Sequence, residues 1–205
     1  MISTCSKCWG NNIYGNLGLG DKQDRGDGAD QMGENLPSVD MGANWMVVEV
    51  AAGSYHACAR LENGAARAVK CWGSNRGSLG LGDSDDRGAE VGEMGDSLPE
   101  VQLGTNRSAV ALGLGQFHSC ALLEDGSVKC WGANNAGQLG LGDTDRRGAR
   151  EGEMGDRLPA VDLGDGRTAV QLATGRDHTC VLLDNGQLYA PRSAPLPWMG
   201  CVRLA

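Results

Sequence analysis

The apolar residues of this chain fall into short runs separated by glycine, proline, asparagine and aspartate. The clearest runs are Trp45–Ala52, Ala109–Leu114 and Ala169–Ala173. Short apolar runs bounded by turn-forming residues predict β-strands. Nowhere do apolar residues recur at i, i+3, i+4 and i+7 over a dozen positions, as an amphipathic helix requires. The pattern therefore predicts an all-β protein.

One order of motifs occurs three times. Each block opens with Cys-Trp-Gly, at residues 8–10, 71–73 and 130–132, at intervals of 63 and 59 residues. Gly-x-Leu-Gly-Leu-Gly-Asp, a polar acidic segment and Leu-Pro follow, and the block closes with Gly-x-x-His-x-Cys and an Asn-Gly or Asp-Gly turn. About four short strands per block of this length is typical of a propeller blade. We expect three repeats, at about 8–70, 71–129 and 130–189.

The second and third blocks carry these motifs most completely, in Gln116–Gly126 and Leu139–Asp143. They resemble the repeat of the regulator of chromosome condensation family, in a variant with cysteine before Trp-Gly. The resemblance covers about residues 8–189. It implies a seven-bladed β-propeller, of which this all-β chain would hold about three blades as an incomplete segment.

The pattern is lost after Tyr189. Where a fourth Cys-Trp-Gly is due, the chain reads Ala190-Pro191-Arg192. We therefore expect residues 1–189 to form the repeats and residues 190–205 to be a divergent proline-rich tail. This departure predicts that the chain is a fragment of a larger propeller.

Composition excludes several classes of function. Glycine accounts for 33 of 205 residues but follows no three-residue period, so it indicates tight turns and not collagen. The net charge of −8 argues against a nucleic-acid partner, which needs a basic surface. No apolar stretch reaches the 18 residues of a membrane span. No nucleophile-base set stands apart from the repeats, and the glycine-rich motif lacks the strand-to-helix setting of a dinucleotide site. We expect no enzyme activity and no cofactor.

The cysteines of the second block predict a disulfide. A three-residue turn at Glu124–Gly126 would pair Leu123 with Ser127, and counting outward places Cys120 opposite Cys130. Directly opposed residues on antiparallel strands lie within the range a disulfide accepts. Cys58 and Cys71 flank the same hairpin, lengthened by three residues. Reduced buried cysteines and a zinc site remain alternatives, although the spacings do not match those of zinc fingers.

Disulfides imply an oxidising compartment. They favour a secreted or cell-surface protein, whose signal sequence would lie upstream, and a cytoplasmic location is the alternative. Cys8 and Cys180 are left as half-pairs, which we hypothesise to link between chains. Cys5 and Cys201 have no assigned partner. Asn106-Arg107-Ser108 is a glycosylation sequon that has meaning only in a secreted chain.

Several side chains that recur in each repeat resemble metal-binding, catalytic or ligand-binding residues. His56, His118 and His178 belong to successive blades and would point to different sectors, so we expect a structural role in which a ring nitrogen satisfies a turn. Trp9, Trp72 and Trp131 are expected to pack between blades. The acidic loops (Asp83–Asp96 and Asp143–Asp156) could hold calcium, but Arg25, Arg87 and Arg147 favour a solvated, partly neutralised loop.

These observations favour a non-enzymatic module for protein–protein interaction, with an unidentified partner. The family resemblance implies an alternative, a guanine-nucleotide exchange factor or regulator of a small GTPase. Glycan binding is a second alternative, because some propellers support it. A fold shared by many activities does not decide among them.

Overall fold

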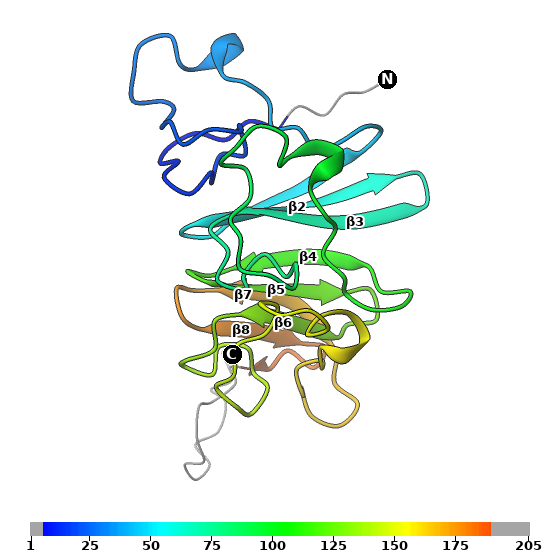
Figure 1. Cartoon of the computed structure of the whole chain (residues 1–205). Helices are drawn as coiled ribbons and strands as arrows, with labels where there is room; N and C mark the ends of the chain where they lie inside the picture. The colour runs from blue at the N-terminus through cyan, green and yellow to red at the C-terminus, as the bar shows by residue number, and fades with distance from the viewer. Residues whose placement is uncertain (1–5, 190–205) are drawn as a thin grey trace.

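The computed structural model describes residues 6–189, which form three antiparallel three-stranded sheets stacked one on another (Figure 1). The first sheet contains β1 (Met46–Ala52), β2 (His56–Asn63) and β3 (Ala66–Gly73). The second contains β4 (Ala109–Leu114), β5 (His118–Leu123) and β6 (Val128–Gly132). The third contains β7 (Ala169–Thr174), β8 (Thr179–Leu183) and β9 (Leu188–Tyr189). The predicted tail, Cys5 and Cys201 lie outside the described residues.

The hairpins form as their turn residues predict. In the second sheet, the backbone N–H of Leu123 donates to Ser127 at 2.9 Å, and Gly126 supplies a positive φ of 77°. In the first sheet, pairing continues to Asn63 and Ala66. The three additional residues of this hairpin therefore lengthen the strands and not the turn.

Each sheet contains three strands, so the expectation of about four strands per repeat is wrong. The segment that follows each Leu-Pro adds only a short extended contact to the outer strand. The N–H of Val101 donates to the carbonyl of Val69, and that of Val161 to Val128, both at 2.8 Å. Proline has no N–H to donate, so the segment beginning at Leu-Pro cannot add a full ladder. Three short 3-10 helices precede the Leu-Pro steps, η1 (Gly33–Asn35), η2 (Gly95–Ser97) and η3 (Gly155–Arg157).

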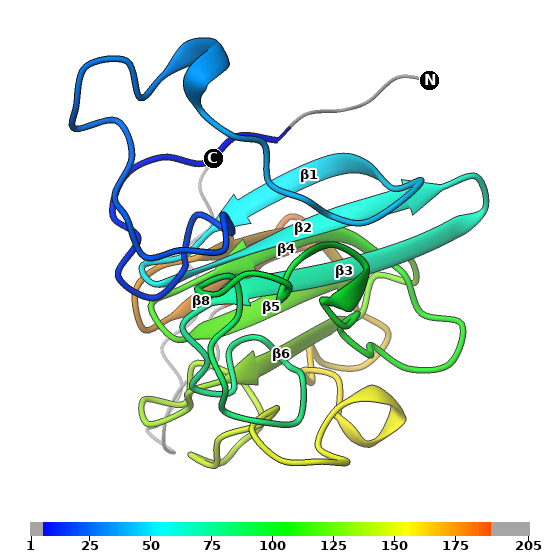
Figure 2. The same cartoon turned by 45° about the horizontal axis from the view of Figure 1, so that its top comes forward.

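The long connections lie outside the stack. Figure 2 shows the segment before β1 at one end and the segment before β7 at the opposite end. Buried lysines hold these connections to the outer strands. Lys129 Nζ donates to the carbonyls of Leu103 (2.9 Å) and Gly155 (2.8 Å), and Lys70 makes the equivalent pair of bonds. Burial lowers the pKa of Lys129.

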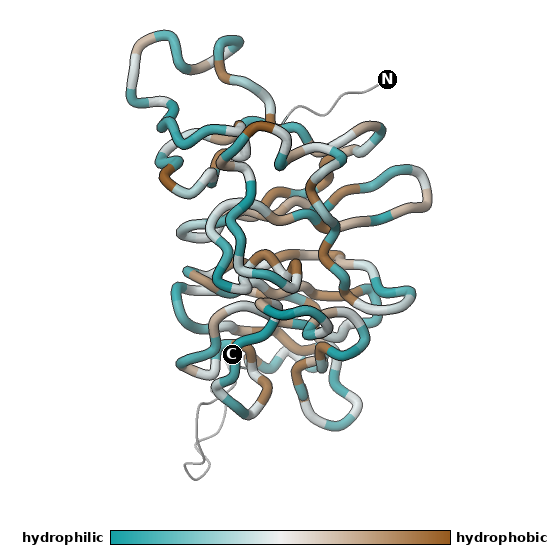
Figure 3. Tube along the Cα trace, in the orientation of Figure 1, coloured by the Kyte–Doolittle hydropathy of each residue, from teal (hydrophilic) through white to brown (hydrophobic). Residues whose placement is uncertain are grey.

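The hydrophobic core lies between the sheets. Leucine, valine and tryptophan side chains of adjacent sheets form three clusters, and apolar residues follow the stacked strands while polar residues dominate the loops (Figure 3). The first and second sheets each end with the Cys-Trp-Gly of the following repeat, so the structural unit is offset from the repeats read from the sequence. Within residues 6–189, no helix has the length and apolar character needed to span a bilayer.

Candidate functional site

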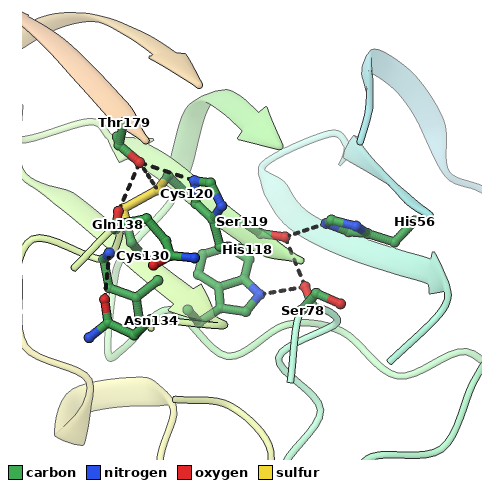
Figure 4. Close-up of a disulfide and its surroundings, with 11 residues drawn as sticks. His56, Ser78, His118, Ser119, Cys120, Cys130, Asn134, Gln138 and Thr179 are labelled. Atoms are coloured by element: carbon green, nitrogen blue, oxygen red, sulfur yellow. Dashed lines mark hydrogen bonds between the residues drawn. A yellow bond between two sulfur atoms is a disulfide. The ribbon is translucent and has the colours of Figure 1, made fainter. Parts of the chain in front are cut away.

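Two of the recurring histidines connect neighbouring sheets. Ser119 Oγ donates to the carbonyl of Ser78 at 2.8 Å, so it can accept the N–H of His56 Nε2, also at 2.8 Å. Trp131 Nε1 donates to the same carbonyl at 2.9 Å (Figure 4). The first sheet, the glycine-rich loop and the second sheet thus share one hydrogen-bond network.

The network repeats one sheet further along the chain. Thr179 Oγ1 donates to the carbonyl of Gln138 at 2.9 Å and lies 3.1 Å from His118 Nε2 (Figure 4). In both networks the Nδ1 atom of the histidine is buried without a hydrogen-bond partner among the described residues. Both rings are therefore held as the neutral Nε2–H tautomer.

Burial keeps these rings neutral. Desolvation, with the nearby His118, lowers the pKa of His56 to about 3. Desolvation also lowers the pKa of His118 to about 4, where Asp177 opposes the shift and His178 adds to it. A ring nitrogen was expected to satisfy a turn, and this expectation is wrong for both rings, because Nε2 binds a hydroxyl of the next sheet. His178 is exposed, because residues 6–189 contain no further sheet to cover it.

The paired cysteines lie at the predicted register. Cys58 faces Cys71 and Cys120 faces Cys130, and each pair is joined by a disulfide with a Cα–Cα distance of 4.1 Å. This separation is that of the closely spaced, non-hydrogen-bonded pairs of an antiparallel ladder. Figure 4 shows the Cys120–Cys130 link beside the Thr179 hydroxyl. Cys8 and Cys180 are free and half-buried.

The tryptophans differ in a way that the repeat does not predict. Trp72 and Trp131 are fully buried, and the glycine-rich loop of the preceding repeat covers each of them. A Cβ on Gly80 would lie 2.8 Å from Trp131 Nε1, so this loop position, with φ +67°, requires glycine. Trp9 is 62% exposed, which contradicts the expected packing, because no loop of a preceding repeat lies within the described residues. The two buried rings cannot reach a glycan.

The acidic loops are internally paired. Asp83 binds Arg87 and Asp143 binds Arg147, both at 2.7 Å, and the first repeat has the same i, i+4 ion pair. The arginines therefore neutralise the loops as predicted. Within the described part of the chain, no group of three or more His, Cys, Asp or Glu side chains could hold a metal ion. Neither the zinc nor the calcium alternative has a ligand set there.

A row of half-buried aromatic rings, which the sequence motifs do not predict, crosses the sheets at one face. Tyr14 and Tyr55 meet edge to face with ring centroids 5.7 Å apart. Tyr55 stacks on Phe117 at 5.1 Å with an interplanar angle of 15°. The guanidinium of Arg76 lies 4.7 Å from the centre of the Phe117 ring. We call these four side chains the aromatic row.

The row arises from two recurring positions. Tyr55 and Phe117 each precede the histidine of a repeat, and Tyr14 and Arg76 each precede the first glycine of Gly-x-Leu-Gly. The carbonyls of Tyr55 and Phe117 accept 2.8 Å hydrogen bonds from Ser74 and Ala133, which fix the backbone at both places. Comparing variable positions between repeats is the signal that could have found the row.

The chemistry of the row suits recognition. Tyrosine and arginine are enriched at the energetically dominant positions of protein interfaces, where an apolar body and a polar tip act together. An arginine over an aromatic face adds a cation–π contribution. The stacked sheets with this face define a β-propeller segment that carries a candidate binding surface.

Comparison with known proteins agrees with the assignment to a β-propeller. Models of the regulator of chromosome condensation (RCC1) repeat match residues 8–60 and 125–182, and a second model of this repeat matches residues 47–77 and 109–138. The chain belongs to the RCC1 repeat family. The fold is an incomplete segment of the propeller seen in its solved members.

Three similar proteins illustrate the range of the family. The chain is 32% identical to the human probable E3 ubiquitin-protein ligase HERC3 over 89% of its own length and 15% of that protein. It is 31% identical to the ultraviolet-B receptor UVR8 of Arabidopsis thaliana, over 88% of the chain and 36% of the receptor. The crystal structure of Prp20p from Saccharomyces cerevisiae superposes with a TM-score of 0.56 at 23% identity, covering 89% of this chain and 40% of that one. The chain thus spans well under half the length of these relatives.

Proposed function

We propose that this chain is a non-enzymatic protein-interaction module that binds its partner through the aromatic row. The observation that carries the proposal is the contact of the half-buried Tyr55 and Phe117 rings with each other and with the exposed Arg76, contributed by adjacent repeats and fixed at both rings by backbone hydrogen bonds. The histidines and hydroxyls that chemistry could use are instead engaged between sheets.

A binding experiment with a matched control tests the proposal. Proteins crosslinked to the wild-type chain in its native source would be compared with those crosslinked to Y55A/F117A/R76E. The control variant V91S/R167E removes an exposed valine, 94% accessible, and an exposed arginine elsewhere. We expect a partner that crosslinks to the wild type and to the control variant but not to Y55A/F117A/R76E, the row variant. In purified form, this partner should bind the wild type at least tenfold more tightly than it binds the row variant. Equal binding by all three proteins would refute the proposal.

Regulation of a small GTPase is the second candidate. It is supported by the likeness to Prp20p, whose crystal structure is described together with its binding properties to Gsp1p and histones. Nucleotide release from a panel of small GTPases separates this candidate from the first. Accelerated release by the wild-type chain, abolished by Y55A/F117A/R76E, would favour the regulator over a passive module.

Glycan binding is the third candidate, and it now depends on the row and not on the tryptophans. Tyrosine and phenylalanine rings can stack on sugar faces as well as on protein. A glycan array on the wild-type chain and on Y55A/F117A/R76E addresses this, because sugar recognition by the row would disappear only in the variant.

We propose a secreted or cell-surface location, with the cytoplasm as the alternative. The disulfides Cys58–Cys71 and Cys120–Cys130 support it, because such links persist outside the reducing cytosol. Alkylation of natively sourced protein before and after reduction, followed by mass spectrometry, tests it. Free thiols at all four positions would reverse the assignment.

A further inference from the structure

The turn that precedes β4 contains the only Asn-x-Ser/Thr motif of the sequence, Asn106-Arg107-Ser108. Asn106 is exposed, and the backbone N–H of Arg107 donates to the carbonyl of Gly104 at 3.3 Å to close the turn. Within residues 6–189, neither the amide of Asn106 nor the hydroxyl of Ser108 makes a hydrogen bond. Both polar groups of the motif are therefore free of other roles in the described part of the chain.

The equivalent turns of the other repeats separate the motif from the needs of the backbone. Asn44, Asn106 and Gly166 are equivalent and left-handed, with φ of 67°, 55° and 67°. Asparagine tolerates this conformation better than most residues, so the backbone explains the asparagine. It does not explain Ser108, because the first repeat has methionine at that position. Among the three repeats, only the second combines the asparagine with a hydroxyl two residues later.

The turn is held in place without Asn106. The backbone N–H and the hydroxyl of Thr105 both donate to the carboxylate of Asp156, at 2.8 and 2.6 Å. These hydrogen bonds lower the pKa of Asp156, which therefore stays ionised as their acceptor. A sugar attached to Asn106 would break no contact that fixes the turn.

A polar hollow lies beside Asn106. Its volume is about 260 Å³, and its lining includes the side chains of Arg67, Glu100 and Gln102. The hydroxyl and acetamido groups of a first sugar can donate hydrogen bonds to carboxylate and amide oxygens and accept them from a guanidinium. The surroundings of Asn106 thus offer both space and hydrogen-bond partners to an attached sugar.

Asn106 and the aromatic row lie at opposite ends of the second sheet. Asn106 comes three residues before β4 and Phe117 three residues after it, and the six-residue strand spans about 20 Å at about 3.3 Å per residue. The β5–β6 turn lies at the Asn106 end, since Arg107 forms an ion pair with Asp125 of that turn. A sugar on Asn106 would cover this end and leave the row open.

We propose that Asn106 is an N-glycosylation site. In the transfer, Asn106 Nδ2 forms a bond to C1 of the first sugar of a lipid-linked oligosaccharide. The C–O bond to the lipid diphosphate breaks, Nδ2 loses one proton, and the diphosphate leaves. The inference rests on the proposed location outside the cytosol, because this modification belongs to surface loops of secreted chains.

Mass spectrometry of natively sourced protein tests the proposal. Peptide N-glycosidase in water labelled with heavy oxygen converts a glycosylated asparagine to labelled aspartate, and an untreated digest controls for spontaneous deamidation. We expect the label at Asn106. Unlabelled Asn106 in protein with linked Cys120–Cys130 would overturn the glycosylation and leave the location standing. Unlabelled Asn106 together with free thiols would overturn both.

Variants of the full chain, secreted from cultured mammalian cells behind a cleavable leader, identify the modified residue. Glycosidase should lower the mass of the wild type by one oligosaccharide and leave the masses of N106D and S108A unchanged. N44D makes the same substitution at the equivalent turn of the first repeat and should behave as the wild type. Circular dichroism verifies the fold of each variant. A mass shift that persists in N106D, or no shift in the wild type, would overturn the proposal.

The third repeat offers a transfer test. G166N completes the motif with Arg167 and Thr168 at the equivalent turn. The φ of 67° suits asparagine there, and a Cβ at Gly166 would meet no atom within 4 Å. We expect two oligosaccharides on this variant. A single oligosaccharide would contradict the argument that this turn accommodates a sugar.

The glycosylation and the interaction function can fail separately. Y55A/F117A/R76E should carry the same oligosaccharide as the wild type, and N106D should bind the partner of the aromatic row as the wild type does. A partner lost with the row variant, together with an unmodified Asn106, would preserve the interaction function and refute the glycosylation site. A glycosylated Asn106, together with equal partner binding by the row variant, would do the reverse.

Discussion

Trp131 and Trp9 occupy the same position in the repeat, yet Trp131 is fully buried and Trp9 is 62% exposed. The histidines show the same contrast, because His118 is fully buried against the next sheet and His178 lies exposed. The middle junction and the open ends therefore share sequence but not environment. A propeller repeat acquires its core from its neighbour, as in other repeat arrays, where each unit contacts only the adjacent ones.

The comparison between the middle junction and the open ends predicts that the tryptophans differ most in their contribution to the free energy of unfolding. W131A should lower the free energy of unfolding by about 3–5 kcal/mol, because a fully buried large side chain and its hydrogen bond to Ser78 are lost. W9A should change it by less than about 1 kcal/mol, as is usual at exposed positions. Urea unfolding monitored by circular dichroism measures both. Equal losses would show that the open end is covered in solution.

The disulfides give the next largest effect. C120A/C130A should cost about 2–3 kcal/mol, because the link restricts the unfolded chain. C8A/C180A should leave the unfolding midpoint unchanged, since both cysteines are free. Urea unfolding of the variants under non-reducing conditions measures this. If the wild type lost no stability on reduction, the contribution of the links would be disproved.

The histidines predict a dependence on pH. His118 has a pKa of about 4 in the folded chain and an ordinary value near 6.5 when unfolded, so the unfolded state binds its proton first. Its contribution is fully present above pH 6.5 and is lost as the pH falls toward 4, at about 1.4 kcal/mol per pH unit. His56 continues the loss to about pH 3.

Substitution isolates this effect from the protonation of carboxylates. H118Q should reduce the slope of the unfolding free energy against pH between 6.5 and 4 below that of wild type, and the buried His56 should account for part of the slope that remains. Urea unfolding at half-unit pH steps makes the comparison. The same slope in wild type and H118Q would contradict the neutral, buried state of His118.

The smallest effect concerns the free cysteines at the two open ends. If Cys8 and Cys180 link chains, as hypothesised, oxidised protein should migrate as a dimer or larger species on a non-reducing gel, and C180A should restore the monomer. The stability of each chain should not change. If the oxidised wild type migrated only as a monomer, the hypothesis of a link between chains would be refuted.

Much of the fold could be read from the chain because its determinants are local. The pairing of Cys120 with Cys130 followed from counting outward from the Glu124–Gly126 turn, and the structure confirms this register. The strand Ala109–Leu114 has the predicted bounds. Strand pairing within a hairpin depends on residues near in sequence, which makes such counting reliable. The prediction of a fourth strand was wrong because the Leu-Pro segment returns from a long connection, where no local rule fixes the strand pairing.

Contacts between repeats could not be read in this way. Tyr55 and Phe117 stack although 62 residues separate them along the chain, and His56 meets Ser119 across a similar span of 63 residues. Whether a recurring side chain is buried, as Trp72 is, or exposed, as Trp9 is, depends on which loop docks over it.

The sequence by itself determined the repeat, the all-β class, the hairpin register and the family, because each depends on short-range patterns of apolar residues, glycine and cysteine. The tertiary structure alone decided the aromatic row and the hydrogen bonds between sheets. Each of these joins residues of different repeats, and their meeting depends on how one sheet packs on the next. That packing is set by the fit of whole surfaces, which no single motif of the chain encodes.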